Sequence, residues 1–88
     1  MTDTTITVPV MLDNGAEVHE FHLLHPGGNG HRPHGIALCH WPHGIGEWVT
    51  WVIYRDENDR WHAEHGHYLT SLTEAVADFR DRAPGYEP

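Results

Sequence analysis

The chain has 88 residues, of which 39% are hydrophobic, and it carries a formal net charge of −8 at pH 7. This length leaves room for one small hydrophobic core, and an apolar content that includes four tryptophans excludes a disordered chain. The acidic charge argues against direct nucleic-acid binding, which depends on lysine and arginine side chains at the phosphates. A single cysteine, Cys39, excludes an internal disulfide. We therefore predict one globular domain over residues 1–88.

The sequence pattern predicts no contact with a membrane. No stretch reaches the roughly 18 apolar residues that cross a bilayer. Residues 1–10 have neither the basic nor the apolar region of a signal peptide. We therefore expect a cytoplasmic protein.

Two strands joined by a tight turn are predicted in the first part of the chain. Apolar and polar residues alternate over residues 5–12, which indicates a strand with one buried face. Pro9 has no N–H for a ladder, so this strand is expected at a sheet edge. The pair Asn14 and Gly15 is typical of a hairpin turn, and a return strand is expected over residues 16–24.

Three further strands follow. Residues 36–41 predict a short strand, and residues 47–55 form the most β-prone stretch of the chain. Because apolar residues of 47–55 fall on both of its faces, we expect it at the centre of the sheet. After a polar turn at residues 56–59, residues 61–65 predict the last strand.

A helix is predicted at the C-terminal end. Ser71 and Glu74 have the spacing of a capping box, in which the two side chains satisfy backbone N–H groups at the start of a helix. An apolar stripe follows at Leu72, Ala75, Val76, Phe79 and Ala83. Pro84 and Gly85 end the helix, and residues 84–88 are expected to be a frayed tail. The predicted fold class is α+β, with about five mainly antiparallel strands and this helix packed on one face.

The tryptophans suggest a surface for a partner. Trp48 and Trp51 lie on opposite faces of the predicted central strand, and a single helix covers only one of these faces. The other face would then present aromatic side chains, which are enriched at protein interfaces. The candidate partner-binding residues are Trp41, Trp48, Trp51 and Trp61. The alternative is a well-filled core with scattered exposed aromatics.

Ten histidines are the second feature that points to chemistry. Imidazole is a good ligand for zinc, nickel or copper, and a His-x-His on a strand places both rings on one face. The candidate metal ligands are His40, His43, His65 and His67. The alternatives are exposed or hydrogen-bonding histidines without a metal, or a pH-sensitive surface, because protonation of all ten moves the formal net charge to about +2.

Catalytic templates do not fit the sequence, so we predict that the chain is not an enzyme. His62 and Glu64 match the first half of a zinc-deaminase signature, but its Cys-x-x-Cys does not follow. Ser71 is explained as a helix cap. Cys39 is expected to be a small buried apolar residue.

Residues 66–82, with the lysine-free composition, resemble the strand-to-helix ending of small uncharacterised proteins of GC-rich actinobacteria and their phages. The resemblance implies an accessory phage product that binds and modulates a host protein, and it brings no catalytic residues. Because the tryptophans lie on both faces of the central strand and a catalytic set is missing, the leading hypothesis is a small acidic non-enzymatic protein-binding module. Its expected partner is a host protein or a second copy in a homodimer. The alternative is a histidine-rich protein that binds zinc or nickel.

Overall fold

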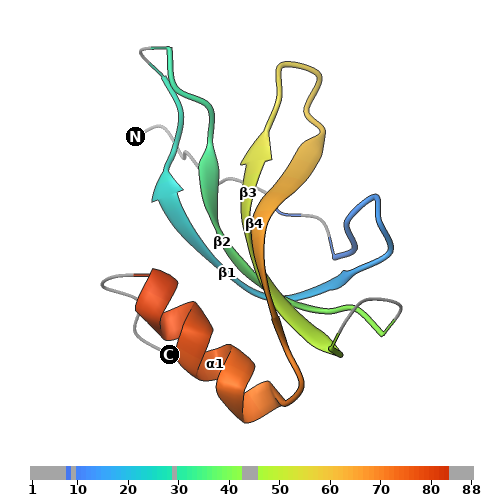
Figure 1. Cartoon of the computed structure of the whole chain (residues 1–88). Coiled ribbons are helices and arrows are strands. Elements are labelled where there is room, and N and C mark those ends of the chain that lie inside the picture. Colours follow the sequence, from blue (N-terminus) through green and yellow to red (C-terminus); the bar gives the residue numbers. More distant parts are fainter. Residues whose placement is uncertain (1–7, 9, 29, 43–45, 84–88) are drawn as a thin grey trace.

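The computed structural model describes residues 8, 10–28, 30–42 and 46–83, which form one open antiparallel sheet and one helix (Figure 1). The strands are β1 (Glu17–His25), β2 (His34–His40), β3 (Trp48–Arg55) and β4 (Trp61–Leu69), and the helix is α1 (Leu72–Arg82). The strand order is β1-β2-β3-β4, so that each strand pairs with its neighbour in sequence. The predicted α+β class is confirmed.

The predicted number of strands is wrong for the described part of the chain, where there are four instead of five. Much of the strand expected over residues 5–12 lies outside the described residues, as does the expected frayed tail at residues 84–88. Met11 forms only an isolated bridge to Glu17. The predicted turn is present: Gly15 has φ = 90°, and its N–H donates to the carbonyl of Leu12 at 2.9 Å.

The helix begins as predicted. The Ser71 hydroxyl oxygen accepts a hydrogen bond from the Glu74 N–H at 3.1 Å, which satisfies one of the unpaired donors of the first turn. The buried side chains of Ala75 and Phe79 then pack on Ile36 of β2. We call this side of the sheet the helix face. In the described residues no helix has the length and apolarity required to span a membrane.

A polar network fastens the helix to the sheet. The Thr50 hydroxyl on β3 donates to Asp78 of α1. The Arg82 guanidinium donates to the carbonyl of Thr50 at 2.9 Å and to that of His65 at 2.7 Å. His67 of β4 completes the network, with Nδ1 3.0 Å from Oδ1 of Asp78. Charge-assisted hydrogen bonds therefore connect the helix to the two strands beneath its second half.

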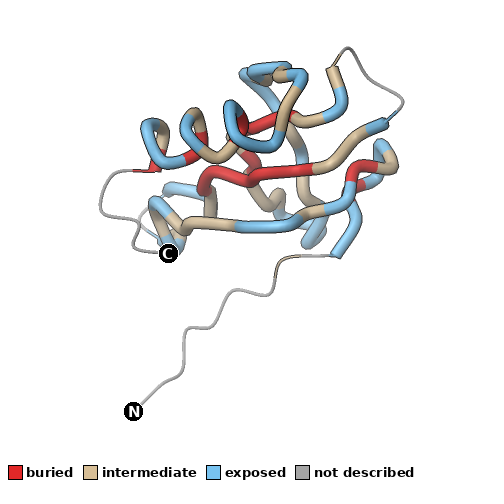
Figure 2. Tube along the Cα trace, turned by 90° about the horizontal axis from the view of Figure 1, so that it is seen from below, coloured by how far each residue is buried: buried red, intermediate tan, exposed pale blue. Residues whose placement is uncertain are grey.

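The opposite side of the sheet, the far face, is partly covered by the chain itself. Leu12 and Ala16 from the N-terminal turn are buried in one cluster with Trp51. Phe21 of β1 and Trp61 of β4 meet there, with ring centroids 5.8 Å apart. These two strands are three spacings apart, about 14 Å in a flat sheet. The sheet must therefore curl until the side chains of its two edge strands touch. The buried segments lie in the middle of the molecule (Figure 2).

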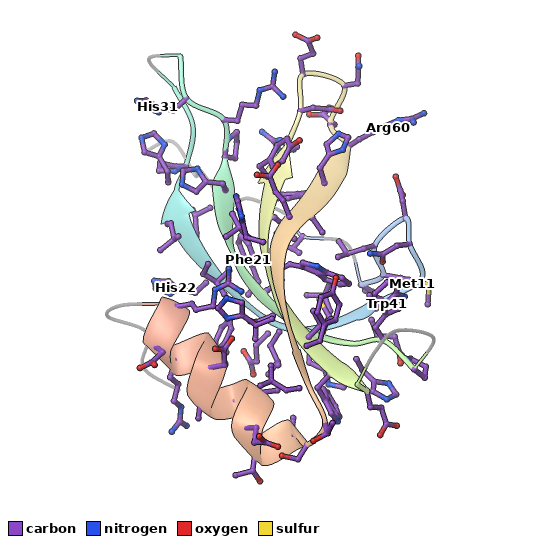
Figure 3. All side chains as sticks on the ribbon, in the orientation of Figure 1. Met11, Phe21, His22, His31, Trp41 and Arg60 are labelled. Carbon is purple, nitrogen blue, oxygen red and sulfur yellow. The ribbon has the colours of Figure 1, made fainter. Side chains whose placement is uncertain are left out.

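The aromatic cluster on the far face is also held to the N-terminal turn. The Trp41 indole lies beside the segment that carries Met11 (Figure 3), and its N–H donates to the carbonyl of Asn14 at 3.1 Å. Its ring centroid is 5.1 Å from that of Trp51. Trp51 is therefore covered, whereas Tyr68, whose ring centroid lies 6.3 Å from those of Trp41 and Trp51, is 48% exposed.

Candidate metal-binding site

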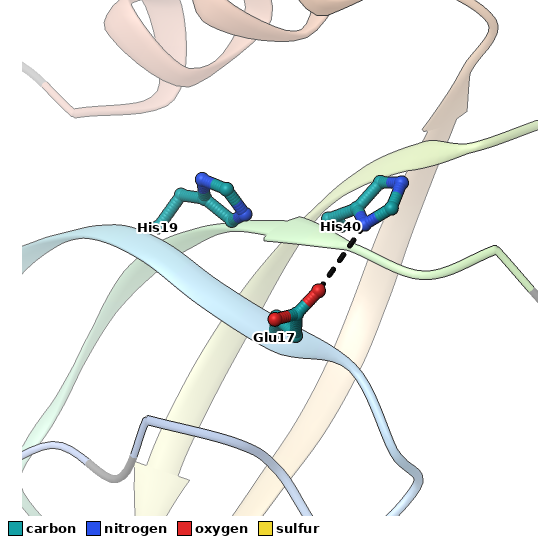
Figure 4. A group of neighbouring side chains, drawn as sticks. All are labelled: Glu17, His19 and His40. Carbon is teal, nitrogen blue, oxygen red and sulfur yellow. Dashed lines mark hydrogen bonds and ion pairs between the residues drawn. The ribbon is translucent and has the colours of Figure 1, made fainter.

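Three metal-ligating side chains meet at one end of strands β1 and β2. One donor atom each from Glu17, His19 and His40 can be chosen so that all three lie within 4.8 Å of one another (Figure 4). Glu17 and His40 are direct partners in the β1–β2 register. Their side chains approach with Oε1 of Glu17 3.3 Å from Nδ1 of His40. Two adjacent strands therefore supply the donors at a fixed spacing.

A β-bulge brings His19 into this group. In the register, Val18 pairs with Cys39 and Glu20 pairs with Leu38, so His19 is the extra residue and has no partner across the ladder. A bulge bends the strand locally and redirects a side chain. The His19 ring reaches His40, with ring centroids 6.2 Å apart in an edge-to-face arrangement.

Carboxylates face both ring nitrogens of His40. Nε2 lies 3.1 Å from Oε1 of Glu47, and Nδ1 lies 3.3 Å from Oε1 of Glu17. The hydrogen bonds to Glu47 and then to Glu17 raise the pKa of His40 above its ordinary value, although desolvation opposes them. Because a metal ion binds only the neutral ring, protonation of His40 competes with metal binding, and the raised pKa strengthens this competition.

Trp48 forms one wall of the site. Its ring centroid is 4.7 Å from that of His40 and 5.2 Å from that of His19. The indole is half-buried and packs against the core of the helix face. Because the indole fills the space beside both imidazoles, it restricts their rotamers on that side.

The donor set suits a borderline divalent metal ion. Two imidazoles and one carboxylate are the ligands of several three-ligand zinc sites, which leave a fourth position open to water or another ligand. Bonds of about 2.0–2.1 Å in tetrahedral geometry place neighbouring donor atoms roughly 3.3 Å apart. The separation of 3.3 Å between Glu17 and His40 matches that spacing.

The structure brings only one of the four predicted histidines into this cluster. His40 is a member, whereas His43 lies outside the described residues. His67 pairs with Asp78 in the network beneath the helix, and the exposed His65 pairs with Glu64. His67 pairs with Thr50 and Glu64 pairs with Val52, so the register shifts between them, and His65 lies inside this bulge with φ = 53°. The regular alternation that would place both rings on one face is therefore broken.

The predicted tryptophan set is divided between the two sides of the sheet. Trp51 is only 4% exposed, and Trp41 and Trp61 pack around the same far-face cluster. Trp48 belongs to the helix face. A partner-binding surface made of all four side chains is therefore not present, and binding of a host protein or a second copy stays a prediction without this support.

Sequence reasoning missed Glu17, His19 and Glu47. The only local signal is the alternation of Glu17 and His19 within the predicted strand over residues 16–24. His40 lies 23 residues after Glu17, and the strand register alone brings the two together. No spacing rule for metal ligands covers such a set.

Comparison with protein-family models, with curated proteins and with solved structures finds no match to this chain. The resemblance to actinobacterial and phage proteins therefore stays a prediction, as does the host-protein partner that it implies.

Proposed function

We propose that this chain binds one divalent first-row transition metal ion, with Zn²⁺ or Ni²⁺ as the best candidates, through Glu17, His19 and His40. The observation that carries the proposal is the convergence of these three donors from two paired strands. Chain topology, not sequence proximity, creates the cluster. The formal net charge of −8 adds a field that attracts cations.

The residues present fit such an ion better than they fit calcium or magnesium. Two of the three donors are imidazoles, which prefer zinc, nickel and copper, whereas calcium and magnesium prefer oxygen ligands. Thiolate sites are excluded here because Cys39, the only cysteine in the chain, is fully buried in the far-face core. Burial also raises the pKa of its thiol to about 12.

The proposed role is binding, with metal-linked stability, and it includes no catalytic step. An ion held by Glu17, His19 and His40 would cross-link β1 to β2 and fix the bulge at His19. Because an unfolded chain does not hold these donors together, the ion would bind the folded state preferentially. The free energy of unfolding would then rise with metal concentration.

Thermal unfolding with added ZnCl₂ or NiCl₂ tests the proposal. At a free metal concentration of 100 times Kd, we expect stabilisation of about 2.7 kcal/mol. His19→Ala should remove most of this effect, because it deletes one of the three donors. His31→Ala is the matched control, because His31 is an exposed histidine at the opposite tip of the β1–β2 hairpin (Figure 3).

Two results would contradict the proposed function. The first is an unchanged Tm of the unmodified protein at a large metal excess. The second is an equal loss of the metal effect in His19→Ala and His31→Ala, which would point to nonspecific binding by exposed histidines. Isothermal titration calorimetry should also give a stoichiometry of one ion for each chain.

A further inference from the structure

The His40 ring has one nitrogen that faces the candidate site and one that faces away from it. Nδ1 lies toward Glu17, and Nε2 lies 3.1 Å from Oε1 of Glu47. Histidines that bind a metal through one nitrogen almost always donate the N–H of the other to a carboxylate, a carbonyl or a water molecule. Glu47 stands where such an outer acceptor is needed.

We propose that Glu47 is a positioning residue that selects Nδ1 of His40 as the metal ligand. The inference rests on the proposed function. With the metal bound, Nε2 keeps its proton and donates it to the Glu47 carboxylate, and the Nδ1 lone pair points to the ion. Without Glu47, neither the ring orientation nor the tautomer would be fixed from this side.

The backbone holds Glu47 at this place. The Trp41 N–H donates to the carbonyl of Glu47 at 2.9 Å, which closes the β2–β3 connection immediately beyond the strand ends. The next residue, Trp48, pairs with His40 in the β2–β3 register. Glu47 therefore lies one residue beyond the His40–Trp48 pair, next to the ring that it orients.

The Trp48 side chain makes this orientation specific. Its ring lies 4.7 Å from that of His40 at an interplanar angle of 44°. The imidazole is thus bordered by the Trp48 and His19 rings and has a carboxylate at each nitrogen. A ring constrained in this way presents a single nitrogen to the site, and the entropic cost of ordering it on metal binding is small.

Zinc affinity measured on three variants separates orientation from charge. Glu47→Ala removes both the hydrogen bond and the charge, and we expect a 10–100-fold loss of affinity. Glu47→Gln removes the charge but keeps an amide oxygen that accepts from Nε2–H, so most of the affinity should return. Glu57→Ala is the control for net charge, because Glu57 is exposed in the turn between β3 and β4 and should bind zinc like the unmodified protein.

Nitrogen NMR of the zinc-loaded protein gives an independent readout. Long-range ¹H–¹⁵N spectra of His40 should show zinc on Nδ1 and a proton on Nε2. Zinc on Nε2 would overturn the inference, as would an affinity of Glu47→Ala within twofold of the unmodified protein. A loss in Glu47→Gln equal to that in Glu47→Ala would also overturn it, because the effect would then be one of charge.

The two proposals fail in different ways. If the unmodified protein does not bind zinc, the proposed function is wrong and the inference about Glu47 falls with it. If the unmodified protein binds zinc and Glu47→Ala binds it equally well, only the inference about Glu47 is wrong. Urea unfolding of each metal-free variant should show that all three are folded at the temperature of the titration.

Discussion

Replacement of Trp51 by alanine tests whether the chain closes its own far face. The Trp51 ring packs on Trp41, and a Cβ added at Gly66 would lie only 2.5 Å from the indole nitrogen, so backbone and side chain are in close contact. A buried aromatic side chain removes about 150–250 Å² from water. At about 25 cal/mol per Å² this burial is worth roughly 4–6 kcal/mol, and a compact unfolded state reduces the value to about 3–5 kcal/mol.

This loss is large for a domain of this size. A chain of 88 residues is expected to have a total stability of about 4–13 kcal/mol. Trp51→Ala should therefore lower the urea midpoint by roughly 2–3 M, given an m value of about 1–2 kcal/mol/M. Far-UV circular dichroism is the suitable probe, because the substitution itself changes tryptophan fluorescence.

Leu24→Ala is the control, because the Leu24 side chain is exposed whereas that of Trp51 is buried. Leu24 is 42% exposed, and Leu24→Ala should change stability by no more than about 0.5 kcal/mol. A loss of stability below about 1 kcal/mol in Trp51→Ala would show that this side chain is not buried in the folded protein. The far face would then be open in solution, and a protein-docking surface at this tryptophan would again be a sound hypothesis.

Three further predictions concern single side chains. Burial raises the pKa of Asp78, but the hydrogen bonds from Thr50 and His67 outweigh burial, so the pKa is lowered in the folded protein. The ionised carboxylate therefore stabilises the fold at pH values above the pKa of the unfolded chain. Asp78→Ala should therefore cost about 1–3 kcal/mol near pH 7 in urea unfolding, and this difference should shrink below about pH 4 as the carboxylate is protonated. The Asp56 carboxyl should titrate by NMR with a pKa of about 2, because His62 hydrogen-bonds to it, and His62→Ala should raise that pKa toward the ordinary value of about 3.9. The Cys39 thiol, buried and with its pKa raised to about 12, should react with a thiol reagent only after unfolding; fast reaction in native buffer would contradict its burial.

Elements that depend on local sequence could be predicted. Ser71 and Glu74 contact each other because they are three residues apart, so the start of the helix follows from a short motif. The turn at Gly15 likewise needs only a residue that tolerates a positive φ. Four of the expected strands are present, with ends shifted by a few residues at most sites.

Features that depend on sheet curvature could not be predicted. Alternation correctly placed Trp48 and Trp51 on opposite faces. It contains no information on how far a sheet coils, and the contact between Phe21 and Trp61 arises only because the two edge strands approach each other. The sequence pattern therefore could not show that Leu12, Ala16 and Trp41 cover Trp51.

The candidate site depends on register and on a bulge, which the sequence does not encode in a short pattern. His40 was identified as a candidate ligand because of its residue type, but its partners were sought at His43, His65 and His67. The β1–β2 ladder instead places Glu17 opposite it, and the bulge adds His19. An unpaired residue in one strand reverses the facing of all residues beyond it, so a one-residue irregularity decides which side chains meet.

Bulges also affect how this sheet meets other molecules. In β1 the ladder is interrupted at His19 and Leu24, and in β4 it is interrupted opposite Trp51. A strand of another molecule could form regular backbone hydrogen bonds with β1 or β4 over only a few residues, because each bulge interrupts the even spacing of donors and acceptors. Such irregular borders oppose fibril-like growth.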